Sequence, residues 1–257
     1  MICRNRVLAL VAAALTVVAA RDTRADDVPG FDRPGIGIST GTLPAGSFDL
    51  ELGLPDFDRS RDSETTTREY AHNSHFRYGL TDRLELQLTV PVLLQRISAL
   101  DGRHTVGGLG DISFGAKTTL PTLGLASQVA AVLSVSAPTA TADMGAGSPA
   151  WSAAVEAGWA LGSKATLNFY TNATLQNGAT TWLLSPSLGF SLTDRLGAYV
   201  EAGQQLAAAG SPALTLAGAG LTWMARDTVQ LDLYLLQQVH GPGSDVAFGC
   251  GVSMFFH

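Results

Sequence analysis

Apolar and polar residues alternate along most of the chain after residue 45. The stretch 84–90 reads Leu-Glu-Leu-Gln-Leu-Thr-Val, and 229–235 reads Val-Gln-Leu-Asp-Leu-Tyr-Leu. A period of two places one class of residue on each face of a β-strand. The pattern therefore predicts an all-β protein.

Nearly the same turn occurs twice between alternating stretches. Residues 79–84 read Gly-Leu-Thr-Asp-Arg-Leu, and 191–196 read Ser-Leu-Thr-Asp-Arg-Leu. Thr-Asp is typical of tight turns because an aspartate side chain bonds to nearby backbone. A repeated strand–turn–strand unit is typical of a meander or an up-and-down barrel.

The alternation and the turn residues divide the chain into about 12 strands. We predict them near residues 45–55, 66–79, 84–96, 109–119, 124–136, 150–161, 164–175, 180–191, 195–205, 212–223, 228–239 and 245–256. Tight turns are expected at 81–83, 121–124, 162–163, 193–194 and 225–227, and long loops at 56–65, 98–108 and 137–149. Short turns at one end and longer loops at the other are typical of an antiparallel transmembrane β-barrel.

The N-terminus has the features of a secretory signal peptide. Arg4 and Arg6 precede an apolar run over 7–20, which is too short to span a bilayer, and small residues at 23 and 25 favour cleavage after Ala25. Cleavage after Ala20 and an uncleaved anchor are the alternatives. We therefore predict a signal peptide at 1–25, a periplasmic N-terminal lead at 26–44 and an outer-membrane barrel at 45–257.

Composition agrees with an envelope barrel and excludes other classes. The chain is 46% hydrophobic but only 15% charged, and its net charge of −6 with no basic cluster argues against nucleic acid as a partner. Cys3 would leave with the signal peptide, so Cys250 would have no disulfide partner. The expected partners are outer-membrane lipids, the barrel assembly machinery and small-molecule solutes.

Alternation alone does not say which face of the sheet points inward. A soluble barrel packs its apolar face inside, whereas a membrane barrel turns that face to lipid. The signal peptide, the sorting of loops by length and the 28 glycines favour the membrane arrangement. The polar face then supplies lumen-lining candidates: Asp49, Glu51, Glu69, His75, Arg77, Glu85, Gln87, Asp111, Lys117, Glu156, Glu201 and Asp232. They could form a structural network of charge pairs, a lining that selects solutes, or both; Arg77 and Glu85 flank one turn closely enough to meet.

Three motifs stand close together in the first part of the predicted barrel: RYGLTDRLEL at 77–86, Val-Pro at 90–91 and GGLGDI at 107–112. In these motifs the chain resembles a family of outer-membrane transporters named for the meta-pathway of phenol degradation, and the resemblance extends over 45–257. It implies an envelope barrel with a transport role for aromatic or other hydrophobic compounds. One departure is His257, which follows Phe256 where such barrels usually end on an aromatic residue.

No pattern points to catalysis, a metal or a cofactor. Residues 72 and 75 are both His, but a separation of three places them on opposite faces of a strand. Ser74 and His75 are adjacent and point apart, which argues against a hydrolase pair. The glycine-rich stretch at 107–110 precedes a strand, whereas a phosphate site needs a helix N-terminus. The main hypothesis is thus a passive channel; a plugged structural barrel and a barrel hydrolase are the alternatives.

Overall fold

The computed structural model describes residues 28–62, 64–99, 102–122, 124, 126–142, 144–206, 213–241 and 244–257. The predicted signal peptide at 1–25 lies outside these residues. Among them, no helix is long and apolar enough to cross a membrane.

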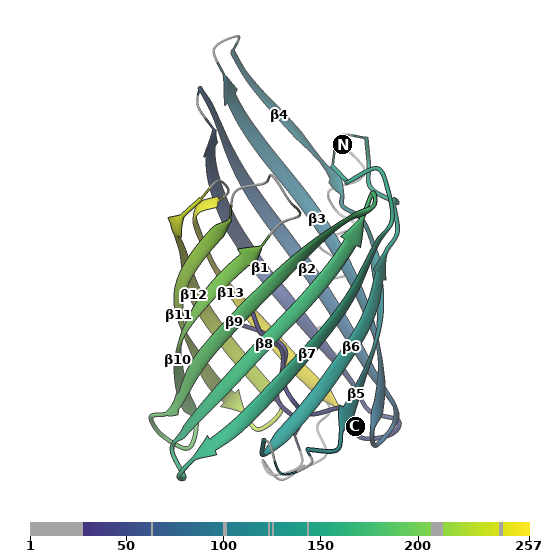
Figure 1. Ribbon diagram of the computed structural model, residues 1–257, viewed down its shortest axis with the longest axis vertical. Coiled ribbons are helices and arrows are strands. Elements are labelled where there is room, and N and C mark those ends of the chain that lie inside the picture. The colour runs from purple at the N-terminus through teal and green to yellow at the C-terminus, as the bar shows by residue number, and fades with distance from the viewer. Residues whose placement is uncertain are drawn as a thin grey trace.

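The described residues form thirteen β-strands, shown in Figure 1. They are β1 (Phe48–Asp62), β2 (Thr65–Thr81), β3 (Leu84–Ala99), β4 (Gly102–Leu109), β5 (Ser113–Leu120), β6 (Gln128–Ser136), β7 (Ala150–Leu161), β8 (Ala165–Gln176), β9 (Ala179–Ser191), β10 (Leu196–Leu206), β11 (Leu214–Arg226), β12 (Val229–His240) and β13 (Ser244–Phe256).

The strands close into one antiparallel barrel. Each strand from β5 to β13 pairs with its neighbour in sequence, β13 pairs with β1, and the β1–β2–β3 pairings and the β3–β5 pairing complete the ring. Strands β4 and β5 both pair with β3, at 92–99 and 84–89 respectively, so they share one position in the wall. The described wall therefore has 13 − 1 = 12 positions, and the prediction of an all-β up-and-down barrel is confirmed.

Two of the three predicted long loops are strands. β1 continues to Asp62 and β2 starts at Thr65, while β3 continues to Ala99 and β4 starts at Gly102. Figure 1 shows both hairpins rising above the rest of the barrel rim. Their charged residues suggested loops, but strands that project into water have no need of an apolar face. Only the prediction for 137–149 is confirmed, since its described residues contain no strand.

The barrel is apolar outside and polar inside. The side chain of Leu133 is 68% exposed and that of Trp151 is 60% exposed, whereas Glu85 and Lys117 are fully buried. A water-soluble barrel would show the reverse distribution. The membrane arrangement of the two faces is therefore confirmed.

The short turns lie at the same end of the barrel as the C-terminus (Figure 1). In both copies of the repeated turn, the threonine hydroxyl accepts the backbone hydrogen bond that we expected the aspartate to make. Thr193 Oγ1 accepts from the N–H of Leu196 at 2.9 Å, and Thr81 Oγ1 accepts from that of Arg83 at 3.3 Å. Asp82 instead accepts the N–H of Ala45 at 3.1 Å, which ties the start of the barrel to this turn.

Candidate functional site

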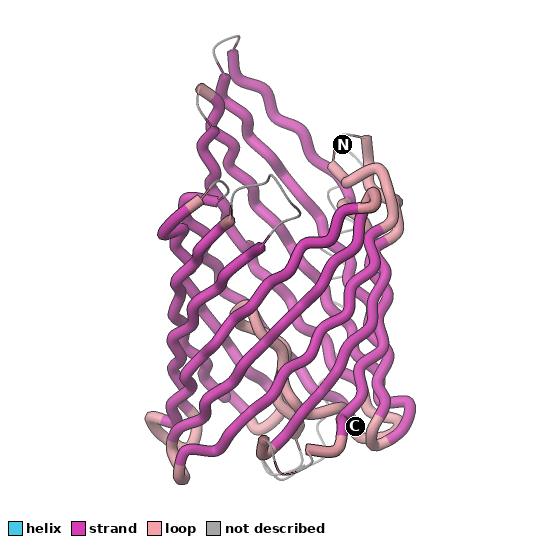
Figure 2. The backbone as a smooth tube through the Cα atoms, viewed as in Figure 1, coloured by secondary structure: helices cyan, strands magenta, loops and turns pink. Residues whose placement is uncertain are grey.

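The lumen contains the chain that precedes β1. We call residues 29–43 the N-terminal segment; it contains no strand, and Figure 2 shows it as a loop running inside the barrel. The sequence pattern predicts a lead ahead of the barrel at 26–44, but the described part of that stretch lies within the lumen rather than outside the wall. The segment forms hydrogen bonds with residues on β1, β2, β3, β5, β6, β10 and β12.

Three glutamates of the wall accept hydrogen bonds from the backbone of the N-terminal segment. Each was predicted to line the lumen, and each comes from a different strand. The bonds run from Asp32 N and Arg33 N to Glu51 at 2.8 and 2.6 Å, from Ile36 N to Glu201 at 2.8 Å, and from Leu43 N to Glu85 at 2.9 Å. A fourth predicted glutamate, Glu156, lies beside the segment at Gly37. Carboxylate–amide bonds of this kind are stronger than neutral ones. The acidic wall is therefore a docking surface for this segment.

Asp32 anchors one end of the segment through its side chain. Its carboxylate lies 2.7 Å from Lys117 Nζ and 3.6 Å from Arg77 Nε, and it accepts a hydrogen bond from Gln87 at 3.2 Å. His75 Nε2 lies 3.7 Å away. Burial acts to raise the pKa of Asp32, but the charges of Arg77 and Lys117 outweigh it and hold the pKa well below the ordinary value. Asp32 is therefore ionised when docked.

Arg33 anchors the segment to strands β1 and β12. Its guanidinium donates two hydrogen bonds of 3.0 Å to Asp56 and one of 3.2 Å to Asp232. It also lies 5.9 Å from the centre of the Tyr234 ring, within the range of a cation–π contact. The two neighbouring residues Asp32 and Arg33 thus bind opposite charges of the wall.

Arg77 binds three carboxylates of the wall at the end of the lumen that lies near the short turns. It donates to Glu85 at 2.8 and 3.0 Å, to Asp49 at 2.9 Å and to Glu51 at 3.3 Å, and its side chain is fully buried. The predicted contact between Arg77 and Glu85 is confirmed. This end of the lumen therefore contains a charge network to which both the wall and the N-terminal segment contribute.

Two of the lumen-lining candidates lie apart from this network. Glu69, in the projecting part of β2, accepts a hydrogen bond from Gln95 at 2.6 Å. Asp111 lies in the break between β4 and β5 rather than in a strand, and it accepts from Ala140 N at 3.0 Å and Ala146 N at 2.8 Å. Asp111 therefore holds the 137–149 loop.

Sequence reasoning missed the contribution of Asp32, Arg33 and Ser39. Ser39 Oγ receives a hydrogen bond of 2.7 Å from Lys117 and donates one of 2.7 Å to Asp32. These residues lack the strand periodicity on which the lumen assignment depended. The available signal was Asp-Arg inside a Gly/Pro-rich stretch, together with Gly35, whose φ of +112° beside Glu201 and Tyr199 suits glycine.

Two cavities flank the segment inside the barrel. One of about 360 Å³ lies over Ile36 and Ile38 and is lined on the wall by His75, Tyr170 and Asn172. The other, of about 280 Å³, lies between Arg33 and the wall at Tyr234 and Glu201. The segment narrows the lumen and leaves space on both sides.

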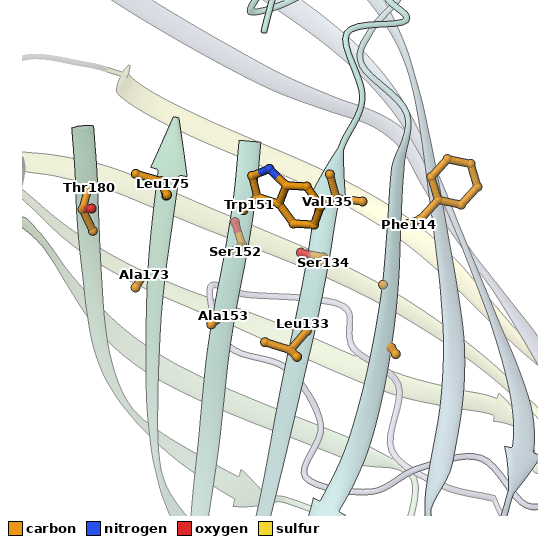
Figure 3. Close-up of a pocket in the computed structure, with 12 residues that line it drawn as sticks. Phe114, Leu133, Ser134, Val135, Trp151, Ser152, Ala153, Ala173, Leu175 and Thr180 are labelled. Carbon is orange, nitrogen blue, oxygen red and sulfur yellow. The ribbon is translucent and has the colours of Figure 1, made fainter. Parts of the chain in front are cut away.

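A larger apolar depression of about 570 Å³ lies on the outer surface. Figure 3 shows Phe114, Leu133, Trp151 and Leu175 around it, on β5 to β8. In a bilayer, this surface would contact lipid chains, so the depression needs no other occupant.

The hydrolase pair and the metal pair that the sequence analysis considered are not formed by the described residues. Ser74 pairs with Val90 in the β2–β3 register, while the His75 ring contacts the hydroxyl of Thr89 at 2.8 Å. His72 contacts the Gly53 carbonyl at 3.2 Å. In the described part of the chain, no three His, Cys, Asp or Glu side chains are grouped so as to bind a metal ion.

Family comparison agrees with this architecture. Residues 31–256 match the family model described as "Putative MetA-pathway of phenol degradation". The chain belongs to this family. The match includes the N-terminal segment from residue 31, so the family pattern is wider than the 45–257 range that carried the resemblance.

Solved structures share the fold at low sequence identity. An outer membrane channel from Pseudomonas putida F1 is 14% identical with a TM-score of 0.69, covering 84% of this chain and 98% of that one. The beta domain of the Bordetella autotransporter BrkA is 12% identical with a TM-score of 0.57, covering 83% and 100%. The NanC porin is 7% identical with a TM-score of 0.53, covering 80% and 98%. No curated protein sequence matches the chain. The fold is therefore that of outer-membrane channels and porins.

Proposed function

We propose that this protein is an outer-membrane channel for the passive passage of small compounds, aromatic and hydrophobic ones among them, and that the N-terminal segment gates it. The observation that carries the proposal is a barrel that is apolar outside and polar inside, with the N-terminal segment docked in its lumen. The chain would be exported by the signal peptide at 1–25, inserted by the barrel assembly machinery and surrounded by outer-membrane lipids. The similarity to the Pseudomonas putida channel and the family description support this assignment.

The lumen has room for small solutes beside the segment. A cavity of about 150 Å³ is enough to hold benzene, and the two cavities beside the segment measure about 360 and 280 Å³. The apolar side chains of Ile36 and Ile38 on one side and the polar wall on the other would suit a ring that carries a hydroxyl group. Movement of the segment would join the two cavities into a path.

The docked segment also supports the alternative of a structural barrel without flux. Asp32 and Arg33 each make charged hydrogen bonds in a confined interior, and breaking a buried pair on one side costs about 3–5 kcal/mol. If the segment never leaves, the barrel is closed. Catalysis has no part in either proposal.

Permeation distinguishes the two proposals. We would measure planar-bilayer conductance, and uptake of phenol and of a neutral sugar into liposomes, for the natural protein and for Asp32→Asn/Arg33→Gln. The matched control is Arg195→Gln, which affects an exposed pair with Asp227 at a turn. The channel proposal expects uptake by the natural protein and higher conductance in the double variant. Absence of uptake and conductance in all three proteins, each folded and inserted, would instead establish the structural barrel.

A further inference from the structure

Arginines gather on one face of the projecting hairpins. Arg59 on β1 lies opposite Arg68 on β2. In the next cross-strand row toward the hairpin tips, Arg61 on β1 and Arg103 on β4 occupy the two ends. We call the exposed members of this group, Arg61, Arg68 and Arg103, together with Arg59, the arginine face.

The arginine face continues the lipid-facing surface. One row nearer the barrel, Phe57 pairs with Tyr70 and Tyr70 with Leu94, and Leu94 is 39% exposed. The Phe57 ring lies 5.2 Å from Tyr70 and 4.8 Å from Phe248. Residues two apart on a strand lie on the same face, roughly 6.6 Å apart. The arginines therefore begin directly beyond an aromatic row, where the apolar band of a membrane barrel ends.

Among the described residues, Arg61, Arg68 and Arg103 form no ion pair, and the exposed Glu64 lies at the tip of the β1–β2 hairpin. Arg59 Nη2 lies 3.5 Å from Asp245 Oδ2. Asp58 and Glu69 lie opposite each other in the register, on the other face of the sheet from Arg59 and Arg68. Like charges directly across strands destabilise a sheet, so this arrangement would be stabilised by an anion from outside the protein.

We infer that the arginine face binds the phosphate groups of the phosphorylated glycolipid, lipopolysaccharide, in the outer leaflet of the outer membrane. The hairpins project from the end opposite the short turns, which in outer-membrane barrels is the outer side. Guanidinium groups bind phosphate through paired hydrogen bonds, and the aromatic row below would contact the acyl chains of the same lipid. This inference rests on the proposed outer-membrane location but not on solute passage.

The test compares two triple variants of the full-length protein. Arg61→Gln/Arg68→Gln/Arg103→Gln removes the exposed members of the face, and Arg83→Gln/Arg195→Gln/Arg226→Gln removes the same charge at the short turns. Each protein is purified in detergent and checked for a heat-modifiable gel shift. Binding is then titrated with lipopolysaccharide, with dephosphorylated lipopolysaccharide and with inorganic phosphate as competitor.

We expect the hairpin variant to bind lipopolysaccharide about tenfold more weakly, while the turn variant keeps natural affinity. Dephosphorylated lipopolysaccharide should bind the natural protein as weakly as intact lipid binds the hairpin variant. Equal affinity of both variants, or equal binding of both lipids, would overturn the inference. Competition by inorganic phosphate as effective as that by the lipid would mean a free-phosphate site and would also overturn it. Conductance of the hairpin variant should be unchanged, so the channel proposal is judged separately.

Discussion

Arg77 and Glu85 form a two-bond ion pair across the first tight turn of the barrel, with N–O distances of 2.8 and 3.0 Å. Arg77 pairs with Gln87 in the β2–β3 register and Glu85 with Gly79, so the two charged residues are diagonal neighbours. Glu85 also accepts the backbone N–H of Leu43. The pair therefore joins the barrel wall to the N-terminal segment.

Arg77→Ala and Glu85→Ala should each destabilise the barrel by about 3–5 kcal/mol, because each removes one side of a buried ion pair and leaves the surrounding charge network unbalanced. The double variant should lose less than the sum of the two. Unfolding in urea, followed by gel mobility, measures these differences. As a control, Arg195→Ala removes an exposed pair and should cost at most about 1 kcal/mol. Strict additivity of the two lumen variants would contradict the coupling.

Phe169→Arg and Asn172→Arg compare the two faces of β8. Phe169 is 40% exposed on the outer surface, while Asn172 lines the larger lumen cavity. An arginine facing lipid near the midplane costs about 2–4 kcal/mol, and one in a solvated lumen costs far less. The yield of folded barrel from membranes should therefore fall only for Phe169→Arg. Equal loss in both variants would mean that the face assignment is wrong.

The contact of Asp32 with the barrel wall should resist mild acid. The pKa of Asp32 is lower when docked than its ordinary value of 3.8. Its contribution is thus fully present above pH 3.8 and is lost as the pH falls through the docked pKa. The natural protein should therefore have a lower conductance than Asp32→Asn at pH 7, and the difference should narrow only below pH 3.8. A difference between the two proteins that is already lost at pH 6 would contradict this account.

The two ends of the barrel should differ in access from outside the cell. An epitope inserted after Glu64, at the tip of the β1–β2 hairpin, should be labelled on intact cells. An epitope after Asp194, in a short turn, should be labelled only after the outer membrane is permeabilised. Loop tips tolerate insertions better than buried backbone. Labelling of the Asp194 insertion on intact cells would invert the topology.

The sequence was sufficient for the barrel because its strands follow one local rule. Period-two alternation identified the wall, the inward positions of Glu85 and Lys117, and the contact between Arg77 and Glu85. It failed at 56–65, where charged residues such as Arg59 and Arg61 continue a strand beyond the apolar band. Alternation of polarity does not mark a strand where neither face contacts acyl chains.

The docking of the N-terminal segment could not be predicted from the sequence pattern, for a different reason. Asp32 and Arg33 contact Lys117 and Asp232, which are 85 and 199 residues away. Such partners are set by closure of the whole barrel, and an irregular Gly/Pro-rich stretch has no periodicity that indicates them. The lumen charges were identified, but their binding partner was not.

A reversible cross-link between the segment and the wall tests the gate most directly. A Cβ atom placed on Gly158 would lie 3.4 Å from the Thr40 methyl carbon, so Thr40→Cys and Gly158→Cys should form a disulfide. The pair is introduced with Asp32→Asn, to loosen the segment, and Cys250→Ser, to remove the exposed thiol. Single-channel conductance in planar bilayers is recorded before and after reduction. The account predicts low conductance while the cross-link is intact and a clear rise on reduction; unchanged conductance, with the cross-link and its reduction verified on gels, would contradict the claim that this segment gates the lumen.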